Sequence, residues 1–187
     1  MKTARRRARE FAVQGVYQWQ LNALTATNIE NNLRENEHFA KADESLLRAL
    51  LFGVIQNADI LDKLLVNYYD RDAKEVSPVE RAILRVAALE LTQHADTPYP
   101  VIINEAIEIA KTFGGTDGHR FVNGVLDKLA ADVRAPEVEA QKTAPRVPLV
   151  KRQMDCTARF PTPCVQCRNQ LNLSVERVFK PTNSRPL

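Results

Sequence analysis

Residues 98–129, PYPVIINEAIEIAKTFGGTDGHRFVNGVLDKL, decide the fold because they predict two helices and the turn between them. Each helix has two adjacent apolar rows at helical spacing, so each is expected to bury a wide face. Gly114 and Gly115 follow the first helix, where glycine can take the left-handed conformation that closes a helix. Asp117 suits the N-cap of the second helix. The apolar positions are Ile102, Ile103, Ala106, Ile107, Ile109, Ala110, Phe113, Phe121, Val122, Val125, Leu126 and Leu129.

Two features of this stretch need a further explanation. Gly124 lies inside the second helix, where glycine costs roughly 1 kcal/mol relative to alanine, so we expect a close helix–helix approach there. Polar residues also edge the apolar pattern, and their simplest interpretation is a solvated face with caps. The alternative is a surface for an anionic, planar ligand, because Lys111, Arg120 and the two phenylalanines lie around one turn.

The length and composition are those of one globular domain with an appendage. The chain has 187 residues, 44% of them hydrophobic and 26% charged, as in ordinary globular proteins. No apolar run is long enough to cross a membrane. The N-terminus lacks the apolar core of a signal peptide, which favours a cytoplasmic location.

Positive charge is concentrated at the two ends of the chain. Nine Lys or Arg against four Asp or Glu give residues 135–187 a charge of +5, so residues 1–134 carry −2 of the total +3. Within residues 1–10, five basic side chains oppose Glu10 alone. Binding to a polyanion would therefore be the property of a local patch.

The first helix is predicted over residues 3–24, and its arginines lie on a face apart from its apolar residues. Four arginines in five positions repel one another in a helix. This repulsion favours an anionic ligand, for which guanidinium geometry suits phosphate. The alternative is a solubilising N-terminal run. The arginines are Arg5, Arg6, Arg7 and Arg9.

The middle of the chain predicts further helices of unequal strength. Residues 25–42 are polar and predict at most a short helix around Ile29 and Leu33. Residues 43–69 predict a long helix with a wide leucine stripe and a possible break near Gln56-Asn57. Residues 70–76 form a charged connection.

Ser77 opens another helix with a capping box. Ser77 is the N-cap, Pro78 stands at the first helical position, and Glu80 at the third can complete the box. In the core row that follows, Glu90 stands among apolar residues. It is interpreted as a carboxylate that caps a neighbouring helix or pairs with an arginine, with a functional buried carboxylate as the alternative.

These patterns predict an all-α protein of about six helices in antiparallel bundles, over residues 1–134. Residues 135–187 differ in composition: they hold seven of the ten prolines and none of the six glycines. We interpret them as a proline-rich, poorly ordered tail. The tail also holds Cys156, Cys164 and Cys167, which fall short of the four ligands of a structural zinc site.

No catalytic constellation is found in the sequence. The three histidines are far apart and have no metal-ligand spacing, and no nucleotide-binding or nucleophile motif occurs. The segment 114–118 is glycine-rich and precedes a helix, but it lacks the strand and lysine of a nucleotide loop. We therefore expect a protein that is not an enzyme, with no cofactor and no metal.

Three strings resemble the NusB family of transcription antitermination proteins. They are RRRAREFAVQGVYQWQL, SPVERAILRVAALEL and PVIINEAIEIAKTFGGTDGHRFVNGVLDKL. The resemblance covers residues 1–134. It implies a fold of two perpendicular three-helix bundles. It also implies a heterodimer with the small-subunit ribosomal protein NusE that binds boxA RNA in ribosomal RNA leaders and joins the antitermination complex of RNA polymerase.

The resemblance also implies site residues. The arginine-rich start corresponds to the family's RNA-contacting N-terminus, and a second group falls where the family's RNA surface lies. Tyr17 and Glu80 fall in strings associated with the protein partner. Aromatic stacking and basic contacts to phosphate are how single-stranded RNA is held. The expected RNA-binding residues are Arg5, Arg6, Arg7, Arg9, Lys111, Phe113, Arg120, Phe121 and Asn123.

Two other functions stay open at this stage. The same helical domain occurs at the front of certain RNA cytosine methyltransferases, although residues 135–187 are too few and too rich in proline for a cofactor-binding domain. The other alternative is a homodimeric helical scaffold, because some NusB-like proteins are thought to self-associate through the same surfaces.

Overall fold

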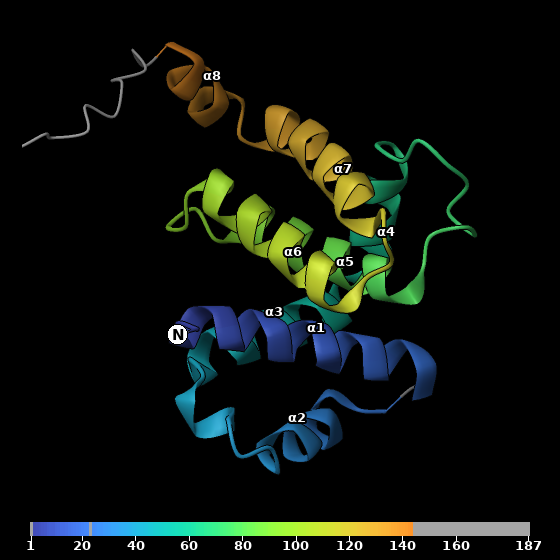
Figure 1. The fold of residues 1–187 in the computed structure, drawn as a ribbon, viewed down its shortest axis with the longest axis vertical. Coiled ribbons are helices and arrows are strands. Elements are labelled where there is room, and N and C mark those ends of the chain that lie inside the picture. Colours follow the sequence, from blue (N-terminus) through green and yellow to red (C-terminus); the bar gives the residue numbers. More distant parts are fainter. Residues whose placement is uncertain (1, 23, 144–187) are drawn as a thin grey trace, which may run out of the picture. The chain divides into compact units, whose positions relative to one another are not determined.

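The computed structural model describes residues 2–22 and 24–143, and every regular element in these residues is a helix (Figure 1). The predicted all-α class is confirmed. The predicted tail lies outside the described residues from 144 onward. The elements are α1 (Ala4–Asn22), α2 (Ala26–Arg34), the 3₁₀ turn η1 (Phe39–Lys41), α3 (Glu44–Gln56), α4 (Ala58–Val66), α5 (Pro78–Gln93), α6 (Tyr99–Phe113), α7 (Gly118–Val133) and α8 (Ala135–Thr143).

The helices form two packed three-helix bundles, as the family resemblance implies. Helices α1, α2 and α3 pack together in one bundle, and α5, α6 and α7 pack together in the other. In Figure 1, α1 and α2 lie in the lower part of the view and α6 and α7 in the upper part. Helix α5 also packs against α1 and α3, so it joins the two bundles. Helix α4 lies against α5, and α8 lies against α7.

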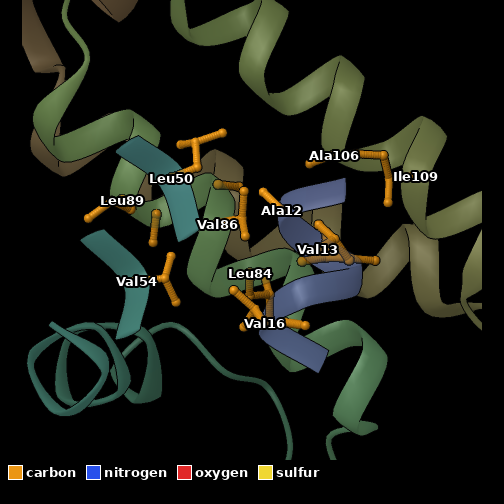
Figure 2. Packing of buried hydrophobic residues seen from close by; sticks show 14 of the residues in the cluster. Ala12, Val13, Val16, Leu50, Val54, Leu84, Val86, Leu89, Ala106 and Ile109 are labelled. Atoms are coloured by element: carbon orange, nitrogen blue, oxygen red, sulfur yellow. The ribbon is translucent and has the colours of Figure 1, made fainter. Parts of the chain in front are cut away.

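A single apolar core runs through both bundles. Val13 of α1, Val54 of α3, Val86 of α5 and Ile109 of α6 are all buried members of the same cluster (Figure 2). Burial of apolar side chains is the main free-energy gain of folding. Because this core is shared, the relative position of α1 and α6 is fixed by packing, which matters for the charged residues on their surfaces.

The predicted break in the long helix occurs at Asn57. Helix α3 ends at Gln56 and α4 begins at Ala58. The Asn57 side-chain amide donates to the Gly53 carbonyl at 2.8 Å, and the same oxygen accepts the Asn57 backbone N–H at 3.1 Å. A polar side chain that bonds to the backbone competes with the helix, which explains the break.

The capping box of α5 is confirmed. The Val79 N–H donates to Ser77 Oγ at 3.3 Å, and the Ser77 N–H donates to Glu80 Oε2 at 3.3 Å. Glu80 is buried by this arrangement. The expected N-cap of α7 differs, since Asp117 stands at that position but makes no side-chain cap hydrogen bond.

Two predictions about glycines are wrong. Gly114 ends α6 with φ of −87°, which is not left-handed. A Cβ at Gly124 would meet no atom within 4 Å, so no neighbouring helix approaches closely there. The close approach lies elsewhere: a Cβ at Gly53 of α3 would stand 2.7 Å from a methyl carbon of Leu89 on α5.

The helical body continues past the boundary expected after Arg134. The Arg134 guanidinium donates to the carbonyls of Leu91 at 2.9 Å and Thr97 at 2.7 Å, across the end of α5 and the turn to α6. From α8, Glu137 accepts from the Tyr99 N–H at 3.1 Å, where α6 begins. Residues 134–137 thus close the α5–α6 turn, and α8 adds nine residues that composition assigned to the tail.

Candidate nucleic-acid and partner surface

The arginines of α1 fall into two groups that the sequence alone did not separate. Arg5 is exposed and Arg6 and Arg7 are half-buried, whereas Arg9 is buried. The first three stand in the first turn of α1, which contains no acidic residue. The N-terminus of a helix carries partial positive charge, so cations there are unfavourable. An external anion would remove this cost, which favours a ligand-binding role for Arg5, Arg6 and Arg7.

Arg9 is part of a buried ion pair between the two bundles. Its Nε donates to Glu90 Oε2 at 2.9 Å, and its Nη2 contacts the other carboxylate oxygen of Glu90 on α5. Burial alone would lower the pKa of Arg9, but the hydrogen bond and charge of Glu90, together with the charge of Glu105, hold the pKa above its ordinary value. The interpretation of Glu90 as the partner of an arginine is confirmed.

Because Arg9 is enclosed in this way, its guanidinium does not face solvent. Its buried pair joins α1 to α5, so Arg9 is left out of the proposed RNA site, and its RNA contact stays an untested prediction. Among the residues of the first turn, Arg5 and Arg7 form no ion pair within the described part of the chain.

Arg6 lies beside α6 and brings two of the expected RNA-binding residues together. Its Nη2 stands 3.6 Å from Glu108 Oε2, and Lys111 Nζ stands 2.8 Å from Glu108 Oε1. Arg6 and Lys111 thus share one carboxylate, although they belong to different bundles. The hydrogen bond and charge of Lys111, together with the charge of Arg6, hold the pKa of Glu108 below its ordinary value.

We call Arg5, Arg6, Arg7 and Lys111 the basic cluster. It combines three side chains of the first turn of α1 with one near the end of α6. The carboxylates around it, on Glu10, Glu105 and Glu108, were not singled out in the sequence. Glu105 and Glu108 are one turn apart on α6, and this spacing was the available signal.

The two phenylalanines expected to stack on RNA bases have different surroundings. Phe113 is 41% exposed at the end of α6, although it continues a row that predicts a core position. Phe121 is 4% exposed; it packs on Tyr69 with ring centroids 5.6 Å apart, and the Arg71 guanidinium covers its ring at 3.9 Å. Phe113 is the more accessible of the pair, whereas Phe121 packs in the core, so its RNA contact stays an untested prediction.

The expected polar residues on α7 are accessible. Arg120 is exposed and stands 3.5 Å from Asp117 in an ion pair. Asn123 is half-buried and donates to Asp127 at 3.1 Å. Both lie on the outer side of α7, and nothing in their contacts connects them with the basic cluster. They stay candidates on a separate part of the surface.

The residues expected to contact a protein partner lie between the end of α1 and the beginning of α5. Tyr17 is half-buried against the core, and Gln20 donates to the Pro78 carbonyl at 3.3 Å. Glu80 is buried in the capping box, and a Cβ at Gly118 would stand 2.5 Å from its Oε1. Glu80 therefore supports this surface from the protein interior, and little of its own side chain is accessible to a partner.

A shallow pocket opens beside these residues. It is lined by Trp19, Gln20, Arg81 and Arg85. The Arg85 guanidinium lies 5.6 Å from the Trp19 ring and its Nε donates to Asp62 at 2.8 Å. Tryptophan and arginine are enriched at protein interfaces. Sequence reasoning did not single out this group, because only the packing of α1 on α5 brings Trp19 beside Arg85.

Within residues 2–22 and 24–143, the histidines, cysteines and carboxylates form no group that could hold a metal ion. No helix among these residues has the length and apolar character required to cross a membrane. The three cysteines of the expected tail lie outside the described residues.

The two joined bundles define a class: helical proteins built from paired three-helix bundles, here with a charged surface along the seam. Comparison with known proteins places the chain within that class. The sequence model of the NusB family matches residues 6–131, and the chain belongs to this family.

Three similar curated proteins are each named transcription antitermination protein NusB. The protein from Chromobacterium violaceum is 68% identical over 143 residues, which are 76% of this chain and 96% of that protein. The protein from Laribacter hongkongensis is 65% identical, with 76% and 87% covered. The protein from Neisseria meningitidis serogroup B is 57% identical, with 73% and 97% covered.

Among solved structures, NusB of T. maritima superposes with a TM-score of 0.62 at 32% identity, covering 74% of this chain and 99% of that one. The matched region makes up nearly all of these relatives, whose names describe an antitermination protein and not the front domain of an RNA methyltransferase.

Proposed function

We propose that this protein binds boxA-type RNA of ribosomal RNA leaders together with the ribosomal protein NusE, and that the basic cluster contacts the RNA. The observation that carries the proposal is the meeting of Arg6 and Lys111 at one carboxylate, beside the exposed Arg5 and the half-buried Arg7 of the same turn. Helices from both bundles contribute, so the folded protein assembles a phosphate-binding surface from segments distant in sequence.

The chemistry of the surface fits single-stranded RNA. Guanidinium groups bind phosphate in a bidentate manner. A base stacked on an aromatic ring contributes about 1–3 kcal/mol, and Phe113 provides an open ring at the end of the helix that carries Lys111. The basic cluster is small, so RNA binding by this protein alone is expected to be weak. The partner protein adds surface and affinity.

We place the partner at the pocket beside Trp19. This assignment uses the half-buried Tyr17 and the exposed parts of Gln20 and Arg81, with Glu80 holding the beginning of α5 in place. The partner surface and the basic cluster occupy opposite ends of α1. One helix therefore carries both contacts, which explains how partner and RNA can be bound at once.

Charge reversal at two arginines tests the RNA site. Arg5→Glu with Arg7→Glu changes side chains that make no ion pair in the described part of the chain, so the fold should be retained. The matched control is Lys63→Glu with Lys74→Glu, which changes the net charge equally at exposed positions of α4 and the loop after it.

Binding is measured by gel shift with boxA-type RNA, with and without NusE. We expect the arginine variant to bind at least about tenfold more weakly, and the slope of log affinity against log salt to become shallower by about 0.7 for each phosphate that the variant no longer neutralises. The control should bind nearly as well as the wild type. Equal binding by both variants would remove the basic cluster from the proposed site.

Light scattering separates this proposal from a homodimeric scaffold. A complex with one copy of this protein, one of NusE and one RNA supports the heterodimer. A dimer of this chain whose mass is indifferent to RNA and to NusE would favour the scaffold instead.

A further inference from the structure

The part of the basic cluster around Arg6 is electrically neutralised by the protein itself. Around Arg6, three cationic side chains face three carboxylates, so the local charge sums to zero. Arg6 Nε stands 3.5 Å from Glu10 Oε1 and 3.8 Å from Glu105 Oε2. The other contacts are Lys2 with Glu10 at 2.8 Å, Arg6 with Glu108 at 3.6 Å and Lys111 with Glu108 at 2.8 Å.

The contacts made by Arg6 are loose. Arg6 Nε, Glu10 Oε1 and Glu105 Oε2 are all shielded from solvent and form no hydrogen bond with one another, and the short contact of Glu10 Oε1 is to Lys2 Nζ at 2.8 Å. By contrast, Arg9 Nε donates to Glu90 at 2.9 Å. A buried ion pair without hydrogen bonds loses the solvation of both charges and gains only part of the stabilisation that a hydrogen-bonded pair provides. Arg6 is therefore held by long ion pairs of 3.5 to 3.8 Å, and a ligand that offers it shorter hydrogen bonds can replace its partners.

A phosphate is such a ligand. Its oxygens can accept two parallel N–H bonds from one guanidinium, and they can also accept from an ammonium group. Glu108 already occupies the place between Arg6 and Lys111 that a phosphate would take. Glu108 is 45% exposed in its side chain and lies near the end of α6, so it can turn away without disturbing the core.

We propose that Glu108, supported by Glu105, is a built-in competitor for RNA phosphate at Arg6 and Lys111. The inference rests on the proposed function of the basic cluster and adds its regulation: RNA binds there only when it displaces Glu108. The competitor lowers the affinity of the free protein for any polyanion. RNA that a bound partner presents loses less conformational freedom on binding, so competition by Glu108 lowers its affinity less.

The test is Glu108→Gln, which keeps the shape and the hydrogen-bonding capacity of the side chain and removes its charge. The control is Glu35→Gln at the end of α2, which makes the same change in net charge at an exposed site. Within the described residues, the Glu35 carboxylate forms no ion pair. Fluorescence anisotropy measures the binding of a boxA-type RNA oligonucleotide by the full chain over a range of salt concentrations.

We expect Glu108→Gln to bind the RNA about three- to tenfold more tightly than Glu35→Gln at low salt, the size expected for partly exposed ion pairs. The salt dependence should also become steeper, because a displaced carboxylate in the wild type recaptures cations that the variant does not. Lys111→Gln should weaken RNA binding more in the Glu108→Gln protein than in the wild type, because Lys111 is then free to bind phosphate.

Two failures can be told apart. If the wild type binds the RNA and Glu108→Gln behaves as Glu35→Gln does, or more weakly, the competitor is refuted and the RNA site is retained. If neither the wild type nor the two variants bind the RNA, with or without NusE, the proposed function fails, and the inference falls with it.

Discussion

The buried pair of Arg9 and Glu90 gives the sharpest prediction about stability. Arg9→Met removes the guanidinium and keeps an unbranched apolar side chain of similar length. Glu90 then loses its partner while only 1% exposed. Its surroundings in the seam between α1, α5 and α6 include Val13, Ile102 and Ile109, which offer no hydrogen bond.

The size of the effect follows from the cost of leaving a buried charge unpaired. Breaking a buried ion pair by removing one partner typically costs about 3–5 kcal/mol. For a protein of about this size, each kcal/mol lowers Tm by roughly 2–4 °C, so Tm should fall by roughly 6–20 °C. Replacing both residues, with Arg9→Met and Glu90→Met, removes the unpaired charge and should recover most of the loss.

The assay is thermal and urea denaturation followed by circular dichroism, with Arg120→Gln as the control. Arg120 forms an ion pair at the surface, where such pairs contribute little, so its loss should leave Tm almost unchanged. A fall in Tm for Arg9→Met no larger than that of the control would refute the reasoning. So would a double variant that is less stable than either single variant.

Two further predictions concern other parts of the fold. Gly124→Ala should raise the free energy of unfolding by about 0.5–1 kcal/mol in urea denaturation, because the new methyl group has open space and alanine favours the helix; a loss of stability would show that the space is occupied. Burial raises the pKa of Glu30, but hydrogen bonds and charges from Arg48 and Arg34 more than offset the effect of burial. The pKa of Glu30 is therefore held below its ordinary value of 4.5. Its stabilising contribution is therefore present above pH 4.5 and lost as the pH falls through the lowered pKa. Glu30→Gln should make stability less dependent on pH in that acidic range, and an unchanged pH profile would contradict this.

Much of the fold could be predicted because local signals and tertiary structure agree. Ser77, Pro78 and Glu80 mark the start of α5 through contacts made within one turn, and these contacts are present. Asn57 ends α3 through a bond to its own helix. Features of this kind depend on neighbours in sequence, so the sequence is sufficient to find them.

The burial of Arg9 could not be predicted from charge alone. The arginine-rich start suggests one surface, yet Arg9 shares a stripe of α1 with Val13 and Val16, both in the core. Glu90 likewise shares a stripe of α5 with Ile83 and Ala87. Opposite charges on two apolar stripes were the signal available, but only the packing of α1 on α5 shows that they meet.

The remaining differences also arise from packing between elements. Gly124 suggested a close approach because glycine is costly in a helix, but the close approach occurs at Gly53. The end of the helical body was placed too early because α8 has no clear apolar stripe of its own. It is positioned by Arg134 and Glu137, which bond to the α5–α6 turn, and such contacts cannot be deduced from composition.

The carboxylates beside the basic cluster were overlooked for the same reason. Glu105 and Glu108 have the pattern of a solvated face of α6, and nothing in the sequence places Arg6 against them. Long-range ion pairs of this kind depend on how two bundles dock. They decide how much positive charge the protein actually presents to a ligand.

The arginine side chains themselves can be observed directly while RNA is added. Heteronuclear NMR of the arginine Nε–H groups, titrated with boxA-type RNA in the presence of NusE, resolves them individually. We predict that the signals of Arg5, Arg6 and Arg7 shift and that the signal of Arg9 stays in place. Unchanged signals for the first three arginines, or a shift confined to Arg9, would contradict the proposed RNA site.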